Sequence, residues 1–136
     1  MTPGAAGVDL HAAVDESVIV RMGEVKKIPT GLFLEIPAGF EGQVRARSGL
    51  ALEKGLALVN APGTIDSDYR GEVGVIVTCL SSTPMLVRRG MRIAQLVFAP
   101  VARVEFDVRE SLAPTERGIG GFGSTGAAAS SNGAST

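Results

Sequence analysis

Residues 73–80, with the sequence VGVIVTCL, decide the fold class of this 136-residue chain. Successive side chains of a β-strand point to opposite faces, so one face of this run carries Val73, Val75, Val77 and Cys79. Ile76 and Leu80 fall on the other face. The run therefore predicts a strand that is covered on both sides.

Similar short runs, bounded by turn residues, recur on both sides of this stretch. They predict strands over residues 17–21, 25–28, 32–36, 40–46, 56–59, 85–87, 93–99 and 101–106. Many short strands at close spacing are typical of a compact β barrel or sandwich. Only Ser48 to Lys54 predicts a helix, with Ser48 as its N-cap and Gly55 ending it. We therefore expect an all-β domain with one short helix.

The composition excludes several classes of function. With 13 Lys and Arg against 14 Asp and Glu, the net charge of −1 argues against a wide nucleic-acid-binding surface. A single cysteine, Cys79, and a single histidine, His11, exclude an internal disulfide framework and most zinc sites. No apolar run approaches the ~20 residues of a membrane helix, and no export signal precedes Asp9. We expect a cytoplasmic protein with neither a nucleic-acid nor a membrane partner.

The chain changes character near Ala113. Residues 116–126 contain five glycines without periodicity, and residues 127–136 are mostly Ala and Ser. Such a segment buries too little apolar surface to offset the ~1–2 kcal/mol per residue that ordering a backbone costs. We expect a β-barrel domain over residues 1–112 and a mobile glycine-rich tail over residues 113–136.

Residues Arg47, Ser48 and Gly49 outline an anion site. A helix that begins here presents free backbone N–H groups, Arg47 adds a guanidinium, and Gly49 allows close approach to the main chain. A phosphate suits such a site. The alternative is an ordinary capped helix with a surface arginine.

The segment 60–71, NAPGTIDSDYRG, also combines groups that suit a nucleotide. Asn60 both donates and accepts, as recognition of an amide-bearing base requires. Asp66 follows an apolar residue and is a candidate base, and the flat ring of Tyr69 suits a sugar or a base. The alternative is a turn in which the acidic residues favour the bend and Tyr69 packs on the hairpin.

Four further positions are weaker candidates. Asp9, taken as a loop residue, could bind hydrated Mg²⁺, although a solvated turn residue is the simpler interpretation. Gln95 points inward on its strand, where it needs a ligand or backbone partner. In the tail, Arg117 could reach a phosphate and Phe122 could stack on a ligand, or the tail is an incidental linker. The basic turn at residues 88–92 indicates a solvated hairpin end.

Five stretches, taken in order, resemble the five motifs of the trimeric dUTPases (deoxyuridine triphosphate nucleotidohydrolases). They are AGVDL at 6–10, RSGLA at 47–51, the segment 60–71, GMRIAQL at 90–96 and RGIGGFGSTG at 117–126. The resemblance spans residues 5–126. It implies a jelly-roll-like, β-clip barrel and a homotrimer whose active sites are shared between chains.

The resemblance also implies an activity and its residues. The family hydrolyses dUTP to dUMP and pyrophosphate with Mg²⁺, which limits uracil incorporation into DNA and supplies dUMP for thymidylate synthesis. By position, Asp66 would activate the attacking water and Asp9 would bind Mg²⁺ through water. The substrate would contact Arg47, Ser48, Gly49, Asn60, Gly63, Thr64, Ile65, Tyr69, Gln95, Arg117, Phe122, Gly123 and Ser124.

Three competing interpretations stay open at this stage. The related dCTP deaminases share the fold, but the Asp66 and Tyr69 pattern and the glycine-rich tail favour a dUTPase. A nucleotide-sensing or protein-binding module would keep the pocket without needing Asp66 and Arg117. A purely structural jelly-roll subunit would leave the order of the motifs unexplained. Relatives usually carry a further strand before the first motif, so either the true start lies upstream or this form lacks that strand, whose absence would weaken the barrel edge or the trimer.

Overall fold

The computed structural model describes residues 2–123. Within them the chain forms one helix and short antiparallel strands. The elements are β1 (Val8–His11), β2 (Val18–Val20), β3 (Val25–Phe33), β4 (Phe40–Arg45), α1 (Ser48–Lys54), β5 (Leu56–Leu58), β6 (Gly63–Ile65), β7 (Glu72–Cys79), β8 (Met85–Val87) and β9 (Arg92–Pro100). The predicted all-β class with one short helix is confirmed for this part of the chain.

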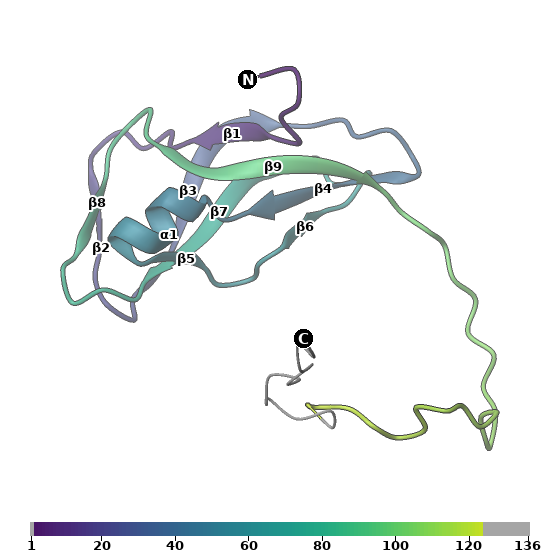
Figure 1. Cartoon of the computed structure of the whole chain (residues 1–136). Helices are drawn as coiled ribbons and strands as arrows, with labels where there is room; N and C mark the ends of the chain where they lie inside the picture. Colours follow the sequence, from purple (N-terminus) through teal and green to yellow (C-terminus); the bar gives the residue numbers. More distant parts are fainter. Residues whose placement is uncertain (1, 124–136) are drawn as a thin grey trace, which may run out of the picture. The chain divides into compact units, whose positions relative to one another are not determined.

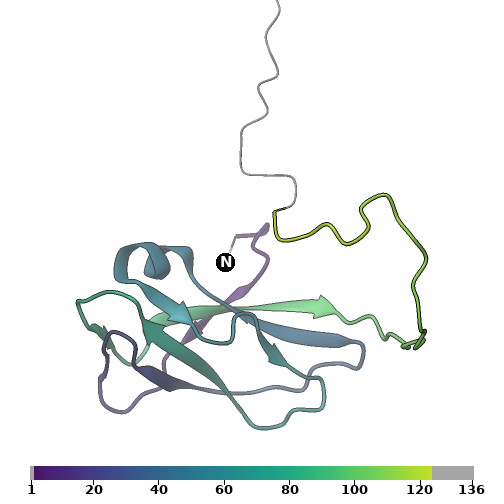
Figure 2. The same ribbon diagram turned by 90° about the horizontal axis from the view of Figure 1, so that it is seen from below.

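The strands form three sheets. The first has the order β1-β9-β4-β6, the second pairs β3-β7-β5, and the third pairs β2 with β8. Figure 1 shows the long β9 between β1 and β4, with β6 at the far edge of the same sheet. Figure 2, turned by 90°, shows β3 and β7 running side by side in the second sheet. β1 and β6 are therefore opposite edges of one sheet.

The predicted apolar face of β7 is the centre of the core. Val73, Val75, Val77 and Cys79 are each 0% exposed. They pack with buried residues of other strands, among them Leu10, Ile28, Val87, Ile93 and Leu96. The expectation that β7 is covered on both faces is wrong for the chain alone: Ile76 is partly exposed and Leu80 is 68% exposed.

The strand predictions need several corrections. β1 and β6 were not expected, and Asp9 lies in β1 rather than in a loop. Residues 25–28 and 32–33 belong to a single β3 with a register shift between Pro29 and Phe33, while residues 34–36 form no strand. Residues 101–106 form no strand either. Their alternating pattern finds no partner in the described chain, and pairing rather than pattern defines a strand.

Helix α1 occupies the predicted residues, but its N-cap differs. Arg47 is the capping position, with an extended backbone (φ −91°, ψ 122°), and no side chain caps the helix. Ser48 is the first helical residue, so its predicted role as N-cap is wrong. Gly55 ends the helix in the left-handed conformation at φ 65°, as expected.

The chain divides into two units, Met1–Arg103 and Val104–Thr136. All strands and the helix described above belong to the first unit. Residues 104–123 of the second unit form neither helix nor strand. The predicted limit of the barrel at residue 112 and the mobility of the tail stay predictions. No helix in the described residues is long and apolar enough to span a membrane.

Candidate active site

An ion-pair cluster centred on Asp9 occupies the β1 edge of the first sheet. Arg47 Nε lies 3.2 Å from Asp9 Oδ1, and Arg92 Nη1 lies 3.2 Å from Asp9 Oδ2. The contact with Arg92 has hydrogen-bond geometry. Arg47 also donates a 3.1 Å hydrogen bond from Nη1 to the backbone oxygen of Arg92. Asp9 thus joins the N-cap of α1 to the first residue of β9.

The two oxygens of Asp9 have different surroundings. Oδ1 is buried and accepts no hydrogen bond, although Arg47 lies close to it. Burial alone would raise the pKa of Asp9, but the hydrogen bond from Arg92, the charges of Arg47 and Arg92, and the Gln95 amide outweigh it. The net effect lowers the pKa of Asp9. The carboxylate is therefore held ionised, with one acceptor oxygen unsatisfied.

A β-bulge brings Arg92 to this cluster. Leu10 pairs with Ala94 while His11 pairs with Arg92, so Ile93 is the extra residue of β9. Ile93 and Ala94 are consequently both buried, and Arg92 emerges on the same outer face as Gln95. The predicted solvated hairpin end is confirmed for the exposed residues 88–90, whereas Arg92 begins β9 and pairs with Asp9. Neither the bulge nor its partner strand is readable from residues 88–92.

Gln95 also differs from expectation. It is exposed rather than inward, because the bulge changes which residues of β9 face the core. Asp9, Gln95 and Arg45 are direct partners across β1, β9 and β4, so their side chains share one face. Ser48 and Gly49 are exposed, and a Cβ placed on Gly49 would meet nothing within 4 Å. This edge of the sheet is open to a polar ligand.

A second group of predicted residues surrounds a cavity of about 290 Å³ beside β6 and β7. Among the nine residues that line it are Asn60, Thr64, Ile65, Asp66 and Tyr69. The side chain of Asp66 is exposed to solvent. The backbone N–H of Tyr69 donates to the backbone oxygen of Asp66 at 3.1 Å, and Tyr69 Oη donates to the backbone oxygen of Glu72 at 3.1 Å.

Two glycines allow this arrangement. A Cβ on Gly71 would overlap the Tyr69 ring, with Cε2 only 2.9 Å away. A Cβ on Gly63 would lie 3.2 Å from Asn60 Nδ2 and 3.3 Å from Val44 Cβ. The glycines therefore let Tyr69 and Asn60 approach the main chain closely.

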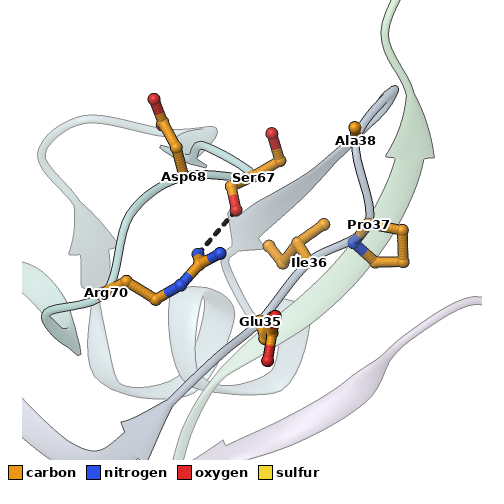
Figure 3. Close-up of a pocket in the computed structure, with 7 residues that line it drawn as sticks. All are labelled: Glu35, Ile36, Pro37, Ala38, Ser67, Asp68 and Arg70. Carbon is orange, nitrogen blue, oxygen red and sulfur yellow. Dashed lines mark hydrogen bonds between the residues drawn. The ribbon is translucent and has the colours of Figure 1, made fainter.

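An adjoining groove of about 580 Å³ holds none of the predicted site residues. It is lined by Glu35, Ile36, Pro37, Ala38, Ser67, Asp68 and Arg70. Figure 3 shows the Arg70 guanidinium directed back toward Ser67, whose backbone oxygen accepts a 2.7 Å hydrogen bond from Nη1. This contact stabilises the loop that follows Asp66.

The two groups of predicted residues lie far apart within one chain. Asp9 and Ile65 are on opposite edge strands, three strand spacings or about 14 Å apart across the sheet. The pairings Asp9–Gln95–Arg45 and Gly42–Ile65 add three residues, or about 10 Å, along the strands. Together these give about 17 Å between the Cα atoms of Asp9 and Ile65.

The remaining predicted residues belong to the second unit. Arg117 Nε donates a 2.8 Å hydrogen bond to the Gly120 oxygen. Phe122 is fully exposed at φ 51°, and Gly123 has φ 85°. Ser124 lies outside the described residues. No group of three or more His, Cys, Asp or Glu able to hold a metal occurs within residues 2–123.

Fold and site define a jelly-roll-like β protein with an Arg–Asp ion-pair cluster at one sheet edge and a separate pocket beside Tyr69. A family model described as dUTPase matches residues 1–126. The chain is 60% identical over 125 residues to a deoxyuridine 5'-triphosphate nucleotidohydrolase of Anaeromyxobacter sp. (strain Fw109-5), covering 92% of this chain and 84% of that protein. A protein of the same name from Anaplasma marginale (strain St. Maries) is 52% identical over 125 residues, covering 92% and 85%.

A solved structure agrees with these sequence matches. The structure of Staphylococcus bacteriophage 80alpha dUTPase with dUPNHPP has a TM-score of 0.76 at 27% identity, covering 91% of this chain and 88% of that chain. The chain belongs to the dUTPase family. The predicted family, the jelly-roll-like fold and the prediction of a hydrolase are confirmed.

Proposed function

We propose that this chain hydrolyses dUTP to dUMP and pyrophosphate, and so lowers dUTP while supplying dUMP. The family and the names of the relatives support the substrate. The two polar groups described above support it further, since one suits phosphates and the other suits a nucleoside. The reaction is attack of water on the α-phosphorus, with cleavage of the bond from that phosphorus to the bridging oxygen.

Asp66 is the proposed general base. Its exposed carboxylate borders the pocket beside Tyr69, where it would accept a proton from the attacking water. The chemistry of phosphoryl transfer asks the protein mainly for positioning and charge stabilisation. A carboxylate fixed beside the α-phosphorus would position the attacking water, and arginines and backbone N–H donors would stabilise the phosphate charge.

The pocket beside Tyr69 is the proposed nucleoside site. Asn60 and the main chain of Gly63, Thr64 and Ile65 would read the uracil edge through hydrogen bonds. The Tyr69 ring would pack on the deoxyribose and exclude a 2′-hydroxyl. The hydrogen bond from Tyr69 Oη to the backbone oxygen of Glu72 fixes that ring before substrate binds.

Phosphate binding is proposed for the β1 edge and for the second unit. At the edge, Arg47, the start of α1 at Ser48 and Gly49, and Gln95 offer donors to an anion. In the second unit, Arg117, Gly123 and Ser124 would close over the terminal phosphates. Phe122 would stack on uracil, consistent with its full exposure in the absence of a ligand.

Asp9 fits the role of binding Mg²⁺ through water. Its carboxylate is held ionised and its side chain is 24% exposed, although Oδ1 itself is buried in the single chain. Only one carboxylate is present there, and no described cluster holds a metal by itself. A hydrated ion carried by the triphosphate satisfies both observations. When bound, Mg²⁺ would neutralise phosphate charge and orient the triphosphate.

We propose a homotrimer whose active sites are shared between chains. Asp66 and Asp9 must both approach one triphosphate, yet the Cα atoms of Asp9 and of Ile65, the neighbour of Asp66, are about 17 Å apart within a chain by strand geometry. Bringing the β6 edge of one copy to the β1 edge of another would remove this separation. The separation of the two edges is the observation that supports sharing.

The decisive experiment is a pyrophosphate-release assay with dUTP beside dTTP, dCTP and UTP, each with and without Mg²⁺. We expect release from dUTP, dependent on Mg²⁺, and at most slow release from the other nucleotides. Ammonia release from dCTP would instead indicate a deaminase. Binding of dUTP without any pyrophosphate release would favour a sensing module.

A further inference from the structure

The floor of the pocket beside Tyr69 is the outer face of β7. Glu72, Gly74 and Ile76 alternate with buried residues along this strand, so the three positions face the same side, and all of them line the cavity. The middle position is a glycine. β7 itself therefore supplies no side chain at the centre of the floor.

The side chain of Lys27 covers this gap. Lys27 lies on the neighbouring strand β3, directly opposite Ile76, and it also lines the cavity. A Cβ on Gly74 would lie 3.0 Å from Lys27 Cγ and 3.2 Å from Lys27 Cδ, and closer still to Cε. The methylene stem of Lys27 thus occupies the space that a side chain of β7 would otherwise fill.

The stem of Lys27, rather than its ammonium group, is the part that packs on the protein. Within residues 2–123, Lys27 Nζ takes part in no hydrogen bond or ion pair, whereas Nζ of the neighbouring Lys26 lies 3.2 Å from Glu24 Oε1. Long cationic side chains commonly lay their methylene groups on an apolar surface and keep the charge in water. Lys27, which is exposed, follows this behaviour.

The Lys27 stem lies between two ends of the pocket that have different partners. At one end, Tyr69 Oη donates to the backbone oxygen of Glu72 at 3.1 Å. At the other end, the backbone N–H of the residue before Asn60 donates to the backbone oxygen of Ile76 at 3.0 Å. With Tyr69 at the sugar and Asn60 at the base, the stem lies beneath the middle of the nucleoside.

We propose that Lys27 is a substrate-binding residue whose methylene stem packs against the nucleoside and, across Gly74, completes the floor of its pocket. This inference rests on the proposed function. The contact is apolar and involves the nucleoside alone. It should therefore strengthen the binding of dUMP and of the triphosphate by the same factor, with or without Mg²⁺.

The test measures the Kd of dUMP and of an α,β-imido dUTP analogue by calorimetry for the wild type and two Lys27 variants. Lys27→Met keeps an unbranched stem without the charge, so both Kd values should stay within about twofold of wild type. Lys27→Ala removes the stem and should raise both Kd values about tenfold, the factor expected for about two buried methylene groups. Because Lys27 is exposed, Lys27→Ala should melt near the wild-type temperature.

Two further positions sharpen the test. Lys26→Ala is the matched control, because it removes a neighbouring lysine that does not line this cavity, and both Kd values should stay unchanged. Gly74→Ala should raise both Kd values, because the new Cβ would displace the Lys27 stem. In a Lys27→Ala background, Gly74→Ala has no stem to displace and should raise neither value further.

Each other result overturns the inference. Equal losses of affinity in Lys27→Met and Lys27→Ala would assign the role to the ammonium group, and a larger loss for the triphosphate than for dUMP would make Lys27 a phosphate ligand. Unchanged binding by Lys27→Ala would show that the nucleoside lies away from the stem, and an equal loss in Lys26→Ala would indicate a general effect of charge. A wild type that binds dUMP but releases no pyrophosphate from dUTP would refute the proposed hydrolysis and not the Lys27 contact, whereas a wild type that binds neither ligand would refute both.

Discussion

Gly7 packs so closely against β9 that adding one methyl group should loosen the β1 edge. A Cβ at this position would lie 2.8 Å from the Leu96 backbone oxygen and 2.8 Å from Val97 Cγ2. Ordinary contact begins at 3.4 Å, so the strand would have to move by about 0.6 Å (3.4 − 2.8). The Leu96 oxygen belongs to the central strand of the sheet and cannot yield by a rotamer change.

Gly7→Ala should therefore destabilise the protein by about 1–3 kcal/mol, the usual cost of overpacking. Reduced freedom of the unfolded chain offsets about 0.4–1 kcal/mol of this. The net loss of about 0.6–2 kcal/mol corresponds to a fall in Tm of roughly 3–12 °C for a domain of this size. Thermal unfolding followed by circular dichroism, at one protein concentration, measures it.

Gly4→Ala is the matched control, because a Cβ there meets nothing within 4 Å. It should melt at or slightly above the wild-type temperature. If Gly7→Ala melts within about 2 °C of Gly4→Ala, the steric argument is wrong. Because Asp9 lies two residues beyond Gly7, displacement of β1 should also lengthen its 3.2 Å contacts and raise the Mg²⁺ requirement.

Three other predictions concern the base, the tail and the response to pH. Asp66→Asn should lower turnover by about 10²–10⁴-fold while sparing nucleotide binding. Asp68→Asn, on the same loop, should leave kcat near the wild-type value. Equal kcat values for the two variants in steady-state assays would exclude Asp66 as the base. Truncation after Ala113 should leave a folded barrel by circular dichroism with severely reduced turnover, and full activity would remove the tail from the mechanism. The pKa of Glu24 in the folded protein is lowered by the backbone N–H of Arg21 and by Lys26. The ionised Glu24 side chain therefore stabilises the fold above pH 4.5, the ordinary pKa of a Glu, and this stabilisation is lost as the pH falls through the lowered pKa of the folded state. Melting curves of Glu24→Gln should accordingly differ from wild type at pH 7 and converge in acid, and a gap that widens in acid would contradict this sign.

The sequence predicted the core better than the edges. The alternation in β7 placed four residues correctly at 0% exposure, because burial of one strand face is a local, periodic property. β1 and β6 were not predicted, because strands of four and three residues with polar side chains on one face give too short an alternating pattern. Residues 101–106 show the opposite error, an alternating pattern without a partner strand.

The bulge at Ile93 explains two separate errors in the site. Strict alternation places Gln95 on the same face as Ile93, but the extra residue buries both Ile93 and Ala94 and exposes Gln95. The same change in register brings Arg92 to Asp9. A bulge arises from pairing between segments 83 residues apart, so residues 88–96 alone could not reveal it. Five residues of the pocket beside Tyr69 were predicted because they are neighbours in the sequence, whereas Lys27, Glu72, Gly74 and Ile76, which also line it, were not.

Placement of Asp9 on one edge strand of a sheet and of Asp66 just after the opposite edge strand has a genetic consequence. If each catalytic centre takes one aspartate from each of two copies, chains inactivated by Asp9→Asn and by Asp66→Asn would complement each other when refolded together. Random assembly from equal amounts would leave about one quarter of the centres with both native carboxylates. Two variants that are each inactive alone would then give an active enzyme together, whereas active sites formed within single chains would regain no activity on mixing.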